Sequence, residues 1–292
     1  MLRQNPSTSN VANLNVTHFN FWPFSNSQVA DLQTVTPINF LQEKFARNTE
    51  NSLMPSKTAS KQLYFDLSRD NFTQHDKLLS QLYLNEKLMA AEELESDLPA
   101  NLHDVISWME QHNAETTRQY QEYLNYRNNG GARQLFSTKS HAYNFMQSVA
   151  PTKLVDGAWL YGLTALWQDH RFSNLIKIYV EELGDGDATK NHVLLYKKLL
   201  ASHDCDHWKH LSDDYFTQGA IQLSLGYNAA EYIPEVIGFN LGYEQLPLHL
   251  LITAYELKEL GIDPYYFTLH FTVDNAATGH AKKAILALFE TM

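Results

Sequence analysis

The sequence GIDPYYFTLHFTVDNAATGHA, residues 261–281, contains a helix boundary followed by a run of candidate metal ligands. Gly261 is typical of the position after a helix C-terminus, Asp263 is typical of an N-cap, and Pro264 suits the first helical position. Apolar residues then recur at helical spacing. These signals predict that one helix ends near residue 260 and that another spans residues 264–291.

The same kind of pattern recurs from residue 71 onward, and no alternating run typical of a β-strand competes with it. The run Asn128–Gly131 interrupts one helical segment, and Pro151 is expected to open another. The fold class is therefore predicted to be all-α. The predicted helices span residues 74–96, 101–127, 132–149, 152–168, 171–183, 190–202, 213–226, 229–260 and 264–291.

The composition favours one large domain with an N-terminal extension. A chain of 292 residues with 44% hydrophobic content can bury a sizeable core. Residues 1–60 are rich in Asn, Ser, Thr and Gln and show no sustained helical period, so we expect an irregular arm there. Residues 61–292 are expected to form the helical, metal-binding catalytic domain.

The charge balance excludes several classes of partner. Lysine and arginine total 22 against 33 acidic residues, which gives a formal charge of −11. This balance lacks the positive field of a protein that binds nucleic acid or an anionic membrane, so we expect a small-molecule substrate and neither of those partners. A homodimer is left open as the assembly.

The sequence also favours a soluble, reducing compartment. Cys205 is the single cysteine and cannot form an internal disulfide. The first residues, MLRQNPSTSN, lack the apolar run of a secretory signal, and no apolar stretch approaches the roughly 18 residues that would span a bilayer. The expected location is the cytoplasm.

The residues that carry chemistry are carboxylates and imidazoles on segments that otherwise resemble packed helices. They occur in IYVEELGDGDATKNHVLLYKKLL (residues 178–200), PEVIGFNLGYEQLP (residues 234–247) and the stretch quoted first. A mixture of oxygen and nitrogen donors suits iron, manganese or zinc. Glu244 is the strongest single candidate because it lies among apolar residues, and a buried lone carboxylate is costly unless it is paired or bound to metal.

The common enzyme motifs are missing. The chain contains no GxGxxG, GxxxxGK[ST], GxSxG or HExxH motif. Asp185-Gly186-Asp187 does not begin a calcium loop, because Lys190 and Tyr196 occupy positions that need glycine and glutamate. There is no Glu-x-x-His pair either, which disfavours a ferritin-like di-iron bundle.

Taken in order, the three segments resemble the iron-containing redox enzymes of the haem-oxygenase-like di-iron oxidase and oxygenase superfamily. The resemblance covers roughly residues 150–282. It implies a haem-oxygenase-like, seven-helix bundle. In that family an acidic residue followed by a histidine, a glutamate from a central helix, and a His-x3-Asp-x2-His element hold the iron.

Carried over residue by residue, the resemblance implies that Glu182 and His192 form the first pair, with Glu181 as a close alternative. Glu244 matches the central glutamate. Asp156 is a further candidate, because related oxygenases can take an extra carboxylate from an earlier helix. Asp156 or Glu181 is therefore expected to act as a supplementary ligand.

The last element departs from the family pattern. His270 and Asp274 match its first two members, but the third would fall on Ala277, and the available histidine is His280. In an ideal α-helix, position 280 is turned by about 80° from position 270. His280 is therefore expected to join the site only if residues 275–279 unwind or bulge.

The resemblance also implies the chemistry. The expected cofactor is Fe(II), as two ions, with O2 as co-substrate and no catalytic residue beyond the metal ligands. The expected activity is that of an iron-dependent oxidoreductase, an oxidase or oxygenase acting on an amino-acid-like or fatty-acid-like molecule. No basic motif beside the candidate ligands marks an anchor for a substrate carboxylate.

Two other classes of function remain open. A metal-free enzyme on the same fold, of the thiaminase-like or quinone-cofactor-forming type, is one, and a non-catalytic helical binding protein is the other. A thiaminase-like enzyme needs a cysteine in its pocket, and Cys205 lies in a charged stretch. That stretch also holds His203, His207 and His210 at the spacing of a zinc-binding face, but its charges favour a solvated connection.

Overall fold

The computed structural model describes residues 58–273 and 279–291, and every regular element within them is helical, which confirms the predicted all-α class. None of these helices is both long enough and apolar enough to cross a membrane. The α-helices are α2 (Ser60–Leu67), α3 (Gln74–Ala91), α4 (Val105–Asn128), α5 (Lys139–Lys153), α6 (Ser173–Glu182), α7 (His192–Ala201), α8 (Thr217–Tyr227), α9 (Ile233–Tyr243), α10 (Leu248–Glu259), α11 (Tyr265–Val273) and α12 (His280–Thr291). Short 3-10 helices join them: η2 (Leu102–Asp104), η3 (Ala158–Leu166), η4 (His170–Phe172), η5 (His207–His210) and η6 (Asp213–Phe216).

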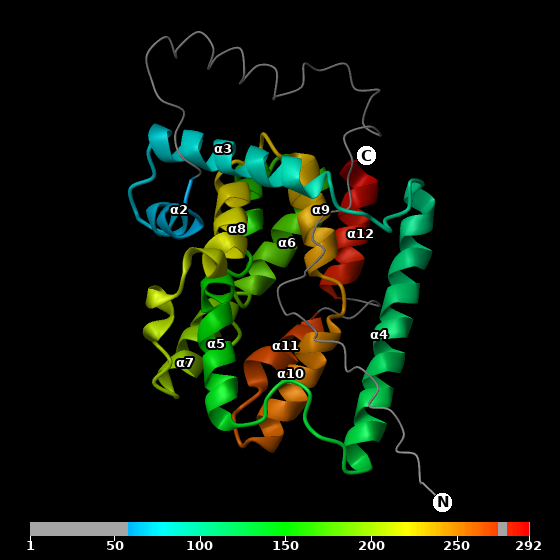
Figure 1. Ribbon diagram of the computed structural model, residues 1–292. Helices are drawn as coiled ribbons and strands as arrows, with labels where there is room; N and C mark the ends of the chain where they lie inside the picture. The colour runs from blue at the N-terminus through cyan, green and yellow to red at the C-terminus, as the bar shows by residue number, and fades with distance from the viewer. Residues whose placement is uncertain (1–57, 274–278, 292) are drawn as a thin grey trace, which may run out of the picture.

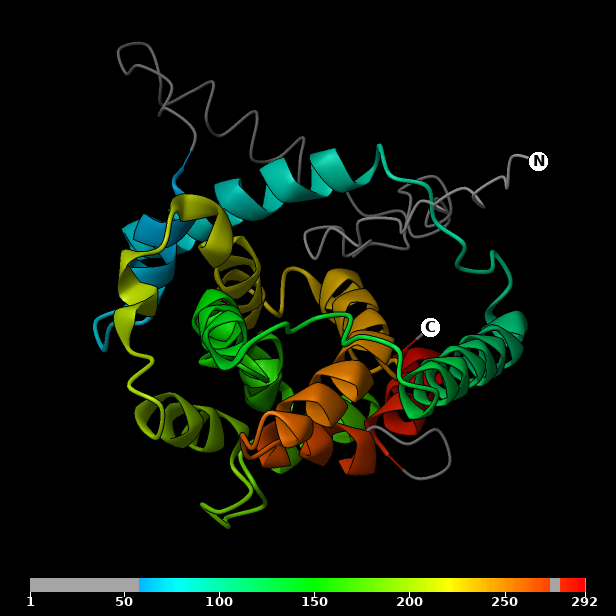
Figure 2. The ribbon, with the colours of Figure 1, turned by 60° about the horizontal axis from the view of Figure 1, so that its bottom comes forward.

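α8 and α9 lie below α3, which runs across their upper ends in Figure 1. α8 packs against α2, α3, α5 and η3, while α12 packs against α6 and α9. α4 packs along α10 and stands at the edge of the molecule in both views (Figure 2). The close approach of α8 and η3 requires a glycine, because a Cβ at Gly226 would lie 2.1 Å from the carbonyl oxygen of Ala158.

Two hydrophobic clusters form most of the core, and the candidate site lies where the helices of one meet those of the other. The first cluster joins η3, α6, α9 and α12 and includes Trp159, Ile178 and Val236. The second joins α5, α7, α10 and α11 and includes Tyr196 and Phe267. Glu182, Glu244 and His280 come from the ends of helices in the first cluster, whereas His192 and His270 come from the second.

The sequence did not predict α2. Its apolar residues Leu63, Tyr64 and Leu67 are almost fully buried and pack with Tyr83 and Phe216. The helix has only 8 residues, which is too short for a helical period to stand out from sequence alone. The predicted arm, residues 1–60, lies outside the described residues up to position 57.

Two predicted long helices are each divided, which corrects the predictions for residues 229–260 and 264–291. The first consists of α9 and α10, which are separated by residues 244–247, where Pro247 cannot donate a helical hydrogen bond. The second consists of α11 and α12. Gly279, just before α12, is not helical, so the helix does not run continuously to His280.

The predicted boundary at Pro151 was also wrong. Pro151 lies in the last turn of α5, where its missing N–H costs a single hydrogen bond, and α5 continues to Lys153. The predicted helix 152–168 is instead a turn followed by η3. Gly157, with a φ of +80°, precedes η3 in the left-handed region that favours glycine.

Candidate metal centre

The described part of the chain contains two buried groups of three side chains that could each hold a metal ion. Asp156, His192 and His270 form the first group, and Glu182, Glu244 and His280 form the second. Within each group the candidate ligand atoms all lie within 4.8 Å of one another. All six residues are at most 5% exposed, so neither group is a solvated surface cluster.

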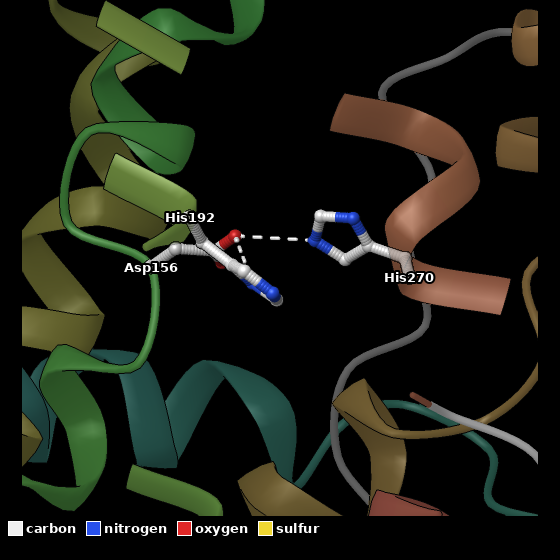
Figure 3. A group of neighbouring side chains, drawn as sticks. All are labelled: Asp156, His192 and His270. Carbon is white, nitrogen blue, oxygen red and sulfur yellow. Dashed lines mark hydrogen bonds and ion pairs between the residues drawn. The ribbon is translucent and has the colours of Figure 1, made fainter. Parts of the chain in front are cut away.

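The first group is organised around Asp156, which lies in the turn between α5 and η3 (Figure 3). Its Oδ2 is 3.3 Å from His270 Nε2 and 3.8 Å from His192 Nδ1. Two tyrosines also hold the carboxylate: Tyr266 donates its hydroxyl proton to Oδ2 at 2.8 Å, and Tyr243 donates to Oδ1 at 3.0 Å. The carboxylate is therefore fixed in orientation.

The ring of His270 is oriented by its own helix. Its Nδ1 lies 2.9 Å from the carbonyl oxygen of Tyr266, one turn earlier in α11. An Nδ1–H donated to that carbonyl leaves the lone pair on Nε2, which faces Asp156. This is the arrangement in which metal-binding histidines are usually held.

The second group is built at three helix ends. Glu182 is the last residue of α6, Glu244 follows α9 directly, and His280 is the first residue of α12. His280 Nδ1 lies 3.2 Å from Glu244 Oε2 and 3.3 Å from Glu182 Oε1. Its other ring nitrogen, Nε2, lies 3.0 Å from Oε2 of Glu181, which also accepts a hydrogen bond from Lys283.

Glu182 connects the two groups. While its Oε1 faces His280, its Oε2 lies 2.5 Å from His192 Nδ1 in the first group. That pair does not have hydrogen-bond geometry, and both atoms are buried without a hydrogen-bond partner, as is Glu244 Oε1. Buried polar atoms of this kind are costly unless something satisfies them, and a metal cation would do so.

The electrostatics of the site favour bound cations. Burial alone would raise the pKa values of Asp156 and Glu182. Lys153, His192 and His270 nevertheless hold the pKa of Asp156 well below its usual range, and His192 and His280 hold that of Glu182 at about 2. Burial lowers the pKa of His192, but the negative charges of Glu182 and Asp156 outweigh this effect and raise it to about 10. The buried carboxylates thus attract positive charge, which protons supply when metal is absent.

Gly157 sets how closely Glu182 approaches the turn that carries Asp156. A Cβ on Gly157 would lie 2.9 Å from Cβ of Glu182, closer than such atoms tolerate. Replacing Gly157 with alanine is expected to cost about 1 kcal/mol for the left-handed backbone and at least about 1 kcal/mol more for the contact with Glu182. Urea unfolding of the variant measures the loss.

Gly130 provides the matched control, because it has a similar φ of +83° and a Cβ there would meet nothing within 4 Å. Gly130→Ala is therefore expected to carry only the backbone cost. Equal losses of stability in the two variants would contradict the close packing of Gly157 against Glu182.

The structure brings together most of the residues that the sequence singled out. Glu182, His192, Glu244, His270 and His280 lie in the two groups, and Asp156 joins them as a full member of the first. Glu181 lies at the outer side of His280. Asp274 lies outside the described residues. Of the stretch 275–279 that was expected to unwind, only Gly279 is described; it is not helical, and the His280 side chain after it is buried.

The rival histidine cluster does not form a metal group in the described residues. His207 and His210 are exposed in η5. Cys205, although its neighbours are charged, is itself only 1% exposed, and burial raises the pKa of its thiol. It packs with the second hydrophobic cluster and does not line the cavity at the candidate site.

A cavity of about 270 Å³ opens beside both groups. Glu182 and Glu244 line it from the second group and His270 from the first. Its walls are mainly apolar and come from α5, the connection between α9 and α10, the start of α10, and α11; they include Phe145, Val149, Leu246, Leu250 and Phe267. A small organic molecule in this cavity would lie directly against the carboxylates and imidazoles.

Sequence reasoning missed two polar residues of this site, Tyr266 and Lys153. Tyr266 had no signal beyond helical spacing, which is equally typical of core aromatics. Lys153 lines the cavity and lies 3.8 Å from Asp156 Oδ1, although no basic motif in the sequence marked it. The spacing Lys-x-x-Asp, which places both side chains near one helix end, was the available clue.

Comparison with known proteins gives one match. The family model described as "Iron-containing redox enzyme" matches residues 143–292, slightly more than half of the chain, and this range contains all six residues of the two groups. No curated protein matches the chain. No solved structure matches it either. The chain therefore belongs to the family of iron-containing redox enzymes.

Proposed function

We propose that this protein is a non-haem di-iron oxidase or oxygenase that uses O2 to oxidise a small organic molecule held in the cavity. Membership of the iron-containing redox enzyme family supports the redox chemistry. The observation that carries the proposal of two ions is the position of Glu182, whose two carboxylate oxygens face different groups of candidate ligands. A carboxylate in this position can bridge two cations.

The donor set fits iron. Asp156, His192 and His270 would hold one ion, and Glu244 and His280 would hold the other, with Glu182 shared between them. This combination of carboxylates and imidazoles is typical of iron, and manganese or zinc could substitute in the same donors. Bound Fe(II) supplies the electrons that activate O2. Asp274 remains a proposed ligand outside the described residues.

The residues around the ligands orient them. The carbonyl of Tyr266 holds the ring of His270, and the hydroxyls of Tyr266 and Tyr243 hold the carboxylate of Asp156. Glu181 faces the Nε2 edge of His280, on the side away from Glu182 and Glu244. We therefore assign Glu181 the role of orienting His280, in place of a supplementary ligand.

Anaerobic loading with Fe(II), followed by dialysis and measurement of iron per chain, tests the proposal. The expected result is about two iron ions per chain, and consumption of dissolved O2 when the loaded protein is exposed to it. An oxygen electrode with a panel of small carboxylic and amino acids then looks for faster uptake. A protein that retains no iron after loading would contradict the proposed function.

Single substitutions distinguish the proposed ligands from the rival histidines. Glu244→Ala or His270→Ala should weaken retention of one iron by more than about a hundredfold, since even the loss of an outer partner of a ligand typically costs 10- to 100-fold. His207→Ala should leave the iron content unchanged, because His207 is exposed in η5 and belongs to neither group. Equal losses in all three variants would mean that the wrong cluster has been chosen.

A further inference from the structure

The cavity beside the two groups contains a lysine to which the proposed function assigns no role. Lys153 is the last residue of α5, and only 8% of it is exposed. Its Nζ donates a hydrogen bond to the hydroxyl of Tyr243 at 2.9 Å, and Tyr243 in turn donates to Asp156. Burying an ammonium group is costly, so a lysine in this position needs a partner of opposite charge.

Asp156 is only a partial partner for the buried ammonium group of Lys153. Its nearest oxygen lies 3.8 Å from Lys153 Nζ, beyond hydrogen-bond distance, and both oxygens already accept hydrogen bonds from tyrosines. A lysine carries three N–H donors. Among the described residues Tyr243 is the hydrogen-bond acceptor found for Lys153, which leaves donors available to a molecule in the cavity.

The charge balance of the site also favours an anionic ligand in the cavity. Two divalent cations would exceed the charge of the three buried carboxylates Asp156, Glu182 and Glu244, while Glu181 is paired with Lys283. Even if Asp274 supplied a fourth carboxylate, Lys153 would remain uncompensated. An enclosed site with surplus positive charge favours an anionic ligand.

The rest of the cavity indicates what else the ligand contains. Gln218, Gln245 and His249 add polar groups to the lining, and the remaining walls are mainly apolar. Burial and then the charge of Lys153 lower the pKa of His249 to about 4, so this histidine adds no second positive charge near neutral pH. A cavity of about 270 Å³ holds on the order of ten non-hydrogen atoms at the packing density of protein interiors.

We propose that Lys153 anchors the carboxylate of the substrate, and that the substrate class is small monocarboxylic acids with an apolar body. The carboxylate would accept hydrogen bonds from Lys153 Nζ, while the apolar body contacts Phe145, Val149, Leu250 and Phe267. Identifying this ligand as the substrate rests on the proposed function. The anchoring itself is a property of the cavity and can be measured without turnover.

The test is equilibrium binding of octanoate, which has about the right number of non-hydrogen atoms, compared with its neutral amide, octanamide. Protein loaded with Zn(II), which has no redox activity, prevents oxidation of the probe, and zinc per chain is measured on the same samples. The wild-type protein is expected to bind octanoate at least about tenfold more tightly than octanamide, because a hydrogen bond to a charged group is stronger than one to a neutral group.

Lys153→Met is expected to weaken octanoate binding by about 10- to 100-fold and to leave octanamide binding nearly unchanged. Lys153→Gln keeps a polar group beside Tyr243 and should show the same loss of preference, so the test stands even if the methionine variant folds poorly. Lys77→Met is the control. Lys77 is also partly buried and ion-paired, with Glu231, but it does not line the cavity.

The outcomes separate the two proposals. If zinc binds and both Lys153 variants still prefer octanoate as the wild-type protein does, the anchor is wrong while the metal centre stands. If no zinc binds, the metal centre is in doubt, and octanoate binding to the metal-free wild-type and variant proteins still decides the role of Lys153. Equal affinity of the wild-type protein for octanoate and octanamide would also overturn the anchor.

Discussion

Replacing Glu182 with glutamine is expected to remove both irons from the protein, although it changes a single side chain. Glu182 Oε2 lies against His192 of the first group and Oε1 against His280 of the second. Glutamine has nearly the same shape but lacks the negative charge and one acceptor oxygen, so one ion would lose its ligand and the other would keep only an uncharged oxygen. The affinity for each ion should fall by more than about a hundredfold.

The measurement is iron per chain after anaerobic loading and dialysis, with Glu244→Gln as the matched control. Glu244 faces only the second group, so its variant is expected to retain about one iron. Circular dichroism checks that both variants are folded. If Glu182→Gln retained one tightly bound iron, as Glu244→Gln should, Glu182 would not bridge the two groups.

Glu256 is expected to make the largest contribution to stability of any single polar side chain considered. It is fully buried in α10 and holds the segment after α4 in place. Its Oε1 accepts hydrogen bonds from Tyr123 at 2.7 Å and from the backbone N–H of Gln134 at 2.5 Å. Its Oε2 accepts from the backbone N–H groups of Leu135 and Phe136, at 3.0 and 2.8 Å.

Glu256→Gln is expected to lower the free energy of unfolding by about 3–5 kcal/mol. The amide replaces one accepting oxygen with an NH2 group that faces donors, so buried backbone N–H groups lose their partner and the remaining bonds lose their charge. Tyr123→Phe removes only one of the four hydrogen bonds and should cost about 1 kcal/mol. Chemical denaturation of the metal-free proteins compares the two.

A loss no greater in Glu256→Gln than in Tyr123→Phe would contradict this role of Glu256. The iron content of the folded Glu256 variant should remain that of the wild-type protein, since Glu256 belongs to neither group of candidate ligands. This second readout separates a loss of stability from a loss of the metal centre.

By itself, the sequence determined the helical class and the kinds of side chain that form the candidate metal centre. Helical class follows from local periodicity, and the breaks at Gly261 and Pro264 were predictable because glycine and proline act through the backbone of a few neighbouring residues. Glu244 could be recognised because a carboxylate among apolar neighbours is costly wherever the chain places it, and it is only 2% exposed.

Only the tertiary structure decided how these donors combine. Asp156 meets His270 across 114 residues, and Glu244 meets His280 across 36, so no local pattern records either contact. The helix breaks before α10 and α12 were hidden for a related reason. Residues 229–260 and 264–291 have helical periodicity throughout, and local propensity is weak enough for tertiary packing to override it. The inward turn of Lys153 likewise depends on Tyr243 and Asp156, which fold against it from outside its own helix.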